Sequence, residues 1–303
     1  MESIINRIIQ LLRIKNPLAA KKLLNNLPYF DNRHNEFTQY YLGNYIRYLE
    51  HSGLTIDFGV NCYVKLLNDM IWQRAQFIES GRYCNDSFIS VDRAVYDNKS
   101  VMEYHMHGLL LAQFLWPDQY QRFTFFYDHL RNYRPVKNYL EIGAGHGLYI
   151  SAARELLADA EQFDLVDVSA TSLNLSKALL ENKSIFFHHR DIFDFDPNYQ
   201  YDFITIGEVI EHLEEPMKML NRIMALLKDD GTVYLTTPVN APMIDHIYLF
   251  STVDEIRTLI GKSGFVIKEE STAISENIDY TKALELKIPI MYAAFIKKAI
   301  KQT

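Results

Sequence analysis

The sequence predicts an α/β fold in which a helical N-terminal region precedes a doubly wound, seven-stranded sheet. Up to about Arg134, apolar residues recur every three or four positions, as they do from Ile4 to Leu12. After Arg134-Pro135, short apolar runs alternate with amphipathic segments, a pattern typical of parallel βαβ units. This change predicts two domains: a helical lid or substrate domain over residues 1–135 and a sheet domain over residues 136–303.

Seven short apolar runs predict the strands of this sheet. They are Asn138–Ile142, Phe163–Val168, Ile185–His188, Phe203–Ile206, Val233–Thr236, Phe265–Ile267 and Ile288–Ile296. Residues 272–284 are polar and have no clear period, so an insertion is expected before the last strand. In a doubly wound sheet, ligands bind outside the carboxyl ends of the strands, so a site is expected there.

Composition and charge narrow the class of protein. The chain has 303 residues, of which 48% are hydrophobic and 23% charged, values that are typical of a globular protein. The two cysteines, Cys62 and Cys84, have no metal-binding or disulfide spacing, and no apolar run approaches the length of a membrane span. We therefore expect a cytoplasmic protein. The net charge is −7 and the excess of acidic residues lies in the second half, which disfavours nucleic acid as a partner.

The strongest motif follows the first predicted strand. Gly143, Gly145 and Gly147 come directly after Tyr139–Ile142, a strand that contains Glu141, and they precede a predicted helix. Glycines at such a turn let the backbone approach a ligand, and amide groups at the helix start face it. A dinucleotide fingerprint needs its third glycine three positions after the second, whereas here it comes after two. The spacing therefore disfavours a nicotinamide or flavin enzyme.

Acidic residues also end the next two strands. Asp167 lies 20 residues beyond Gly147, at a position where a carboxylate can accept both hydroxyls of a ribose. Asp191 follows the third strand and can accept from an adenine amino group, while Ile192 can pack on the ring. The three strand ends together predict a site for a nucleoside-containing cofactor.

With these motifs, residues 136–300 resemble the class I S-adenosylmethionine-dependent methyltransferases, and in particular the ubiquinone-type O-methyltransferase branch. Glu208-Val-Ile-Glu211-His212 and Thr236-Thr237-Pro238 are similar to segments of that branch. The resemblance implies a Rossmann-like methyltransferase domain and S-adenosylmethionine as the cofactor. It also implies the residues that hold this cofactor: Glu141, Gly143, Gly145, Gly147, Asp167, Asp191, Ile192 and Glu208.

Three clusters compete for the methyl acceptor, and each contains histidine, the side chain best suited to act as a base near neutral pH. His212 follows the fourth strand, His246 the fifth, and His107 lies upstream of the first strand; these three are the candidate bases. The residues expected to contact the acceptor are Tyr104, His105, Glu211 and Asp245. Ordinary packing and local hydrogen bonding are the alternative use of each cluster. In the predicted helix, residues 104 and 107 share a face and His105 points elsewhere.

A second hypothesis gives part of these clusters to a metal. The set Glu208, Glu211, His212 and His246 resembles the divalent-metal quartet of small-RNA 3′-terminal 2′-O-methyltransferases. Oxygen and imidazole ligands in that mixture suit Mg²⁺ or Mn²⁺ better than zinc. A Glu-His pair at this place is nevertheless widespread in methyltransferases that bind no metal, and the acidic charge balance counts against RNA.

These observations favour an enzyme that methylates an oxygen or nitrogen atom of a small polar metabolite in biosynthesis. A metal-assisted RNA 2′-O-methyltransferase and a non-catalytic binding module on the same fold remain the alternatives. The apolar stripe within Ser3–Lys15 fits a dimer contact as easily as domain packing.

Overall fold

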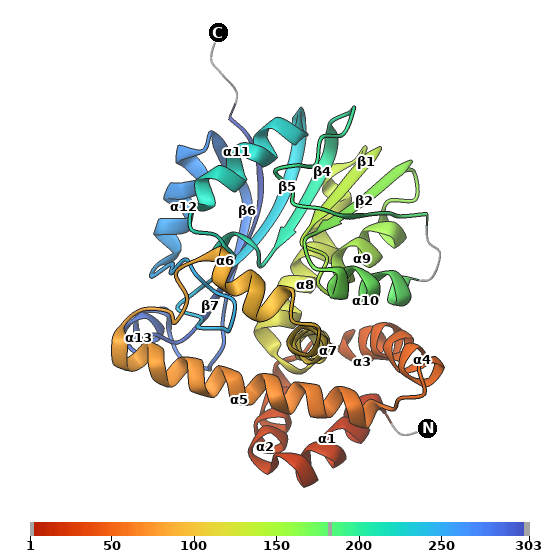
Figure 1. The fold of residues 1–303 in the computed structure, drawn as a ribbon, viewed down its shortest axis with the longest axis vertical. Helices are drawn as coiled ribbons and strands as arrows, with labels where there is room; N and C mark the ends of the chain where they lie inside the picture. The colour runs from red at the N-terminus through yellow and green to blue at the C-terminus, as the bar shows by residue number, and fades with distance from the viewer. Residues whose placement is uncertain (1–2, 181–183, 300–303) are drawn as a thin grey trace.

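The sheet contains seven strands in the order β3-β2-β1-β4-β5-β7-β6 (Figure 1). The protein is described by a computed structural model that covers residues 3–180 and 184–299. The strands are β1 (Asn138–Ile142), β2 (Gln162–Asp167), β3 (Phe186–His189), β4 (Tyr201–Gly207), β5 (Leu227–Val239), β6 (Phe265–Ile274) and β7 (Ile290–Lys298). Strands β1 to β5 pair in parallel, and β7 runs antiparallel to both β5 and β6. The strand order reverses between β1 and β4, which confirms the doubly wound fold.

Helices cover both faces of the sheet (Figure 1). On one face, α8 (Pro117–His129) and α9 (Leu148–Leu156) share a hydrophobic cluster with strand residues. On the other face, α11 (Pro216–Leu226) and α12 (Val253–Lys262) belong to a second cluster. The remaining helices of this region are α10 (Ala170–Leu180) and α13 (Tyr280–Glu285).

The N-terminal region is helical, as its periodicity predicts. Its helices are α1 (Ile4–Lys15), α2 (Pro17–Asn26), α3 (His34–Phe37), α4 (Gly43–His51), α5 (Ile56–Ser80), α6 (Phe88–Val91) and α7 (Lys99–Leu115). The short 3₁₀ or π turns of this region are η1 (Leu27–Tyr29), η2 (Thr38–Leu42), η3 (Asp92–Tyr96) and η4 (Leu130–Tyr133). A further 3₁₀ turn, η5 (Ile210–His212), follows β4. The side chain of Asn16 accepts from the amide of Ala19, and Pro17 occupies the first position of α2, so this pair starts the helix. No helix in residues 3–180 and 184–299 is long and apolar enough to cross a membrane.

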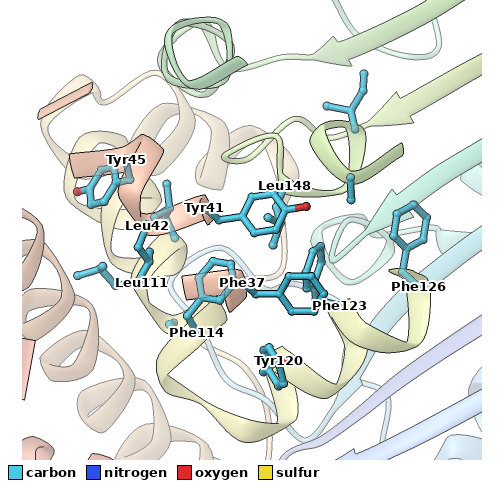
Figure 2. Close-up of a cluster of buried hydrophobic side chains, with 14 of the residues drawn as sticks. Phe37, Tyr41, Leu42, Tyr45, Leu111, Phe114, Tyr120, Phe123, Phe126 and Leu148 are labelled. Atoms are coloured by element: carbon cyan, nitrogen blue, oxygen red, sulfur yellow. The ribbon is translucent and has the colours of Figure 1, made fainter. Parts of the chain in front are cut away.

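One hydrophobic core joins the N-terminal helices to the sheet. The apolar stripe of α1 is buried inside the chain, where α1 packs on α2, α5 and η2, so the structure favours packing within the chain over a contact in a homo-oligomer. Figure 2 shows aromatic rings from the N-terminal helices, such as Phe37 and Tyr41, beside Phe123 of α8 and Leu148 of α9. The rings of Tyr41 and Phe123 pack edge to face, with centroids 5.4 Å apart. The division at residue 135 stays a prediction, since this core crosses it without a break.

The segment expected as an insertion has regular structure instead. Strand β6 continues to Ile274, and α13 occupies residues 280–285. The prediction of an insertion was wrong because polar residues are normal in β6. This strand lies at the edge of the sheet, and its side chains alternate between buried and exposed positions.

Candidate active site

The turn after β1 requires glycine at two positions for different reasons. Gly143 has φ +79°, and a Cβ atom there would lie 2.5 Å from Cγ2 of Val209, so the backbone of this turn packs directly on the segment after β4. Gly145 has φ +48°, and a Cβ atom there would have no heavy atom within 4 Å. Open space therefore borders Gly145, and the expected cofactor fits a cradle that a side chain would fill.

Gly147 was expected to contact the cofactor together with Gly143 and Gly145, but the structure gives it a different environment. It has φ +70°, but it does not line the cavity described below. A Cβ atom would lie 3.1 Å from Cδ1 of Leu180 and 3.3 Å from Cβ of Ser176, both in α10. This glycine is therefore needed for the close approach of the turn to α10 and for the left-handed start of α9.

Two carboxylates flank the glycine turn. Asp167, at the end of β2, accepts from the amide of Ala144 at 2.7 Å and from the amide of Ser169 at 2.6 Å. Burial raises the pKa of Asp167, and these amide hydrogen bonds partly offset that rise. Glu141 is also buried, which raises the pKa of its carboxyl group, and its Oε2 atom has no partner among the described residues. A cationic group of the expected cofactor would supply such a partner.

The other expected cofactor residues also reach this region. Asp191 and Ile192 follow β3, and Asp191 accepts from the amide of Phe193 at 2.9 Å. Glu208 follows β4 with φ +54°, and its carboxylate pairs with the guanidinium group of Arg122. Its Oε1 atom also accepts from Oγ1 of Thr236 at 3.2 Å, so Glu208 is turned toward α8 and β5.

A single cavity of about 560 Å³ connects these residues with the expected acceptor site. Its cofactor end is lined by residues that the sequence predicts: Glu141, Gly143, Gly145, Asp167, Asp191, Ile192 and Glu208. Its other end is lined by His105, His212, Asp245 and His246. Side chains of α2, α5 and α7 close it, among them Leu23, Met70 and His105. The N-terminal helices thus form one wall of a cavity whose opposite wall is the carboxyl edge of the sheet.

Asp245 is the centre of a buried imidazole cluster. Its Oδ2 atom lies 3.5 Å from Nε2 of His105 and 3.3 Å from Nδ1 of His212. Burial alone would raise the pKa of Asp245, but the neighbouring imidazoles His212 and His105 outweigh it and hold that pKa well below its usual range. The hydroxyl group of Tyr96 also hydrogen-bonds Nδ1 of His212. Asp245 is therefore a buried carboxylate that orients two imidazoles at once.

His246 and Glu211 extend this cluster toward the sheet. Nδ1 of His246 lies 2.6 Å from the carbonyl oxygen of Ala241, and burial lowers the pKa of this imidazole to about 3. Glu211 accepts from Oγ1 of Thr237 at 2.8 Å. Burial, followed by the nearby Glu208 carboxylate, raises the pKa of Glu211. Glu211 does not line the cavity but lies behind His212 and His246, which corrects its expected contact with the acceptor.

Tyr104 and His107 lie outside the cavity and contact other N-terminal helices. Tyr104 donates to Asp69 of α5 at 2.6 Å, and Nδ1 of His107 lies 2.7 Å from the hydroxyl oxygen of Tyr45. Neither residue lines the cavity. Burial lowers the pKa of His107 to about 4, as expected of an imidazole packed in the N-terminal core. The hypotheses of an acceptor contact at Tyr104 and of a base at His107 therefore do not agree with the geometry, whereas His105 faces Asp245.

Sequence reasoning missed Arg122 and Tyr96, which both line the cavity. Arg122 is 2% exposed, and its guanidinium group lies between Glu208 and the side-chain oxygen of Gln119. A charged residue inside the apolar, aromatic run of α8 was the available signal. Tyr96 belongs to η3, and nothing in its sequence context distinguishes it from the other tyrosines.

Comparison with known proteins agrees with this architecture. The family described as "Methyltransferase domain" matches residues 115–270, more than half of the chain. The ubiquinone biosynthesis O-methyltransferase of Rhodopseudomonas palustris (strain TIE-1) is 30% identical over 100 residues, 32% of this chain and 38% of that protein. Malonyl-[acyl-carrier protein] O-methyltransferase 1 of Ilyobacter polytropus is 24% identical over 139 residues, 46% of this chain and 51% of that protein. The chain spans about half or less of the length of these curated relatives.

Solved structures with a similar fold have low sequence identity. The N-methyltransferase NodS from Bradyrhizobium japonicum, in complex with S-adenosylhomocysteine, has a TM-score of 0.50 and 14% identity and covers 71% of this chain and 99% of its own. The mitomycin 7-O-methyltransferase MmcR has a TM-score of 0.55 and 12% identity and covers 80% of this chain and 72% of its own. At these identities the likeness shows the fold. By the family match, the chain belongs to the methyltransferase-domain family, within the class I S-adenosylmethionine-dependent methyltransferases.

Proposed function

We propose that this protein transfers the methyl group of S-adenosylmethionine to an oxygen or nitrogen atom of a small polar metabolite. The observation that carries the proposal is the single cavity, which joins the glycine turn and Asp167 to the imidazoles around Asp245. A volume of about 560 Å³ is within the range of small-molecule sites. The helices that close the cavity, together with the acidic charge of the sheet region, favour a small acceptor over nucleic acid.

At the cofactor end, each residue has a role that its position supports. The carboxylate of Asp167 would accept from the ribose hydroxyls with the lone pairs that its two amide hydrogen bonds leave free. Asp191 and Ile192 would contact the adenine, and Glu141 would bind the ammonium group of the methionine part. Arg122 holds Glu208 in place at the same end. When bound, S-adenosylmethionine supplies an electrophilic methyl group.

At the acceptor end, we assign the removal of the proton to His105, which lines the cavity beside the Asp245 carboxylate. Its Nε2 atom faces the Asp245 carboxylate, and its Nδ1 atom has no hydrogen-bond partner among the described residues. Asp245 would hold the tautomer with hydrogen on Nε2, which leaves a lone pair on Nδ1. His105 thus replaces His212 and His246, the bases expected from the sequence, as the proton acceptor in this proposal.

The transfer is an in-line displacement, so the protein mainly aligns the acceptor and removes its proton. The bound donor would supply a methyl group that the acceptor atom takes as the carbon–sulfur bond breaks, with the electron pair of that bond left on sulfur. The proton of the acceptor hydroxyl or ammonium group would pass to His105 Nδ1, a buried nitrogen with no hydrogen-bond partner among the described residues, once the acceptor lies against it. Closure of the cavity by the N-terminal helices would exclude water from this step.

Calorimetric titration with S-adenosylmethionine and S-adenosylhomocysteine tests the cofactor half of the proposal. We expect both compounds to bind the wild-type protein, and Asp167→Ala to weaken binding at least tenfold. The matched control is Asp159→Ala, an exposed aspartate before the other end of β2, which should bind as the wild type does. A folded wild-type protein that binds neither compound would refute the proposed function.

A further inference from the structure

Three electron-pair donors converge at the base of the imidazole cluster. Oε1 of Glu211 lies 3.8 Å from Nε2 of His212 and 4.0 Å from Nε2 of His246. One donor atom from each of the three residues lies within 4.8 Å of the other two. Glu211 is 1% exposed and its Oε1 atom has no hydrogen-bond partner within residues 3–180 and 184–299. The geometry therefore aims an unpartnered buried carboxylate oxygen at two imidazoles.

The backbone fixes the tautomer of His246. Its Nδ1 atom lies 2.6 Å from the carbonyl oxygen of Ala241, and a carbonyl oxygen can only accept a hydrogen bond. The hydrogen of the neutral ring must therefore be on Nδ1. Its Nε2 atom then presents a lone pair to Glu211.

A carboxylate does the same for His212. Its Nδ1 atom lies 3.3 Å from Oδ2 of Asp245, an acceptor that keeps hydrogen on Nδ1. The Tyr96 hydroxyl oxygen is the nearer partner of the same nitrogen, and in this tautomer it accepts from Nδ1. With hydrogen on Nδ1, Nε2 of His212 has a lone pair, and this atom lies 3.8 Å from Oε1 of Glu211.

The third donor is held from both sides. The other carboxylate oxygen of Glu211, Oε2, accepts from Oγ1 of Thr237 at 2.8 Å. Its backbone carbonyl accepts from the amides of Ile247 at 2.9 Å and Tyr248 at 2.8 Å, which ties the segment after β4 to the loop that carries His246. These contacts fix Oε1 in its position opposite the two imidazoles.

We propose that Glu211, His212 and His246 bind a divalent transition-metal ion. Two neutral imidazoles and one carboxylate, with outer partners that orient each ligand, match three-ligand sites that keep further coordination positions open. Metal–ligand bonds of about 2.0–2.2 Å place the donors roughly 3–3.6 Å apart, so the carboxylate–imidazole distances of 3.8 and 4.0 Å, and the 4.8 Å within which all three donors lie, must contract when an ion binds. Without Glu208, nitrogen supplies two of the three donors, so Zn²⁺ and Mn²⁺ suit this set and Mg²⁺ is disfavoured, unlike in the four-ligand set considered from the sequence. Glu208, a member of the quartet that the sequence offered only as an alternative, pairs with Arg122 instead.

A metal ion at this position would determine which chemical group is methylated. This inference rests on the proposed function. His212 and His246 line the cavity, so the open coordination positions would meet the acceptor there. A hydroxyl oxygen is the natural ligand, because a divalent ion lowers the pKa of the group that it binds. The acceptor is then an alcohol or phenol, and methylation occurs on oxygen. His105 stays available for the proton, since it is not one of the three ligands.

Metal binding is tested on the full chain without any methylation assay. The protein is stripped with a chelator and titrated calorimetrically with Zn²⁺ and with Mn²⁺, and Co²⁺ is added separately to record its visible absorption. We expect one site per chain, a Co²⁺ spectrum typical of nitrogen ligation, and at least tenfold weaker binding in Glu211→Gln and in His246→Asn. The matched control is His188→Gln, because His188 is bound to Asp164 outside the cluster and its variant should bind metal as the wild type does.

Circular dichroism confirms that each variant is folded, and the wild-type Co²⁺ spectrum gives a readout that needs no variant. Wild-type protein that binds neither Zn²⁺ nor Mn²⁺ would overturn the proposal. Equal binding in wild type and both cluster variants would also overturn it, since the ions would lie elsewhere. Wild-type protein that binds metal but not S-adenosylhomocysteine would instead refute the proposed function alone.

Discussion

Alanine substitutions at two glycines of the turn after β1 should have different effects, one on cofactor affinity and the other mainly on the stability of the protein. At Gly145 a Cβ atom would meet no heavy atom within 4 Å, whereas at Gly143 it would lie 2.5 Å from Cγ2 of Val209. Gly145→Ala therefore occupies space that we assign to the cofactor. Gly143→Ala forces two parts of the protein apart.

The magnitudes follow from these contacts. Both glycines have positive φ, +48° at Gly145 and +79° at Gly143, which costs an alanine about 1–2 kcal/mol. Gly143→Ala adds overpacking of about 1–3 kcal/mol, so its total loss of unfolding free energy is about 2–5 kcal/mol. Gly145→Ala should lose only the first contribution. Its affinity for S-adenosylhomocysteine should nevertheless fall at least tenfold, which corresponds to about 1.4 kcal/mol.

Urea unfolding followed by circular dichroism measures the stabilities, and calorimetry measures the affinities. The refuting result is a folded Gly145→Ala protein that binds S-adenosylhomocysteine as tightly as the wild type does. The open space beside Gly145 would then not belong to the cofactor. Equal stability of the two variants would refute the contact with Val209 as the cause of the difference.

Three further perturbations test the surrounding structure. Glu208→Ala leaves the buried guanidinium group of Arg122 without its carboxylate, and urea unfolding should show a loss of about 3 kcal/mol; a loss below about 1 kcal/mol would contradict a tightly held pair. Burial lowers the pKa of His107 in the folded protein to about 4, whereas its value in the unfolded chain is about 6.5. The unfolded chain therefore binds the proton first, and the stability of the folded protein falls as the pH drops from about 6.5 to 4. His107→Gln should remove up to about 3 kcal/mol of that pH dependence, and unchanged unfolding curves across this range would show that the ring is not responsible. Gly261→Ala, in the last turn of α12 with open space at its Cβ, should stabilise the protein by about 0.5–1 kcal/mol, and a loss of stability in the same assay would contradict the helical geometry.

The cofactor end of the cavity was predictable because its residues follow strands. In a parallel sheet, the carboxyl ends of neighbouring strands lie at one edge, so sequence positions alone bring Asp167, Asp191 and the glycine turn together. Gly147 shows the limit of this argument. Its place in the motif is right for a ligand loop, but the contact that requires it is with α10, and only the packing of the two helices reveals that contact.

The acceptor end depends on how helix α7 is oriented, which no local pattern specifies. Helical spacing correctly separates His105 from Tyr104 and His107, because residues three apart share a face and the next residue does not. The sequence cannot say which face meets the sheet. The structure turns His105 to Asp245 and gives the other two to α5 and α4.

Arg122 was hidden for the same reason. In the sequence it belongs to an aromatic run that predicts a buried helix, and a buried charge there has no visible partner. The partner is Glu208, 86 residues later, at the end of β4. Because an ion pair of this kind exists only once α8 has packed on the sheet, it links the N-terminal wall of the cavity to the strand end that we assign to the cofactor. A change that loosens α8 should therefore weaken cofactor binding even when it touches no cofactor residue.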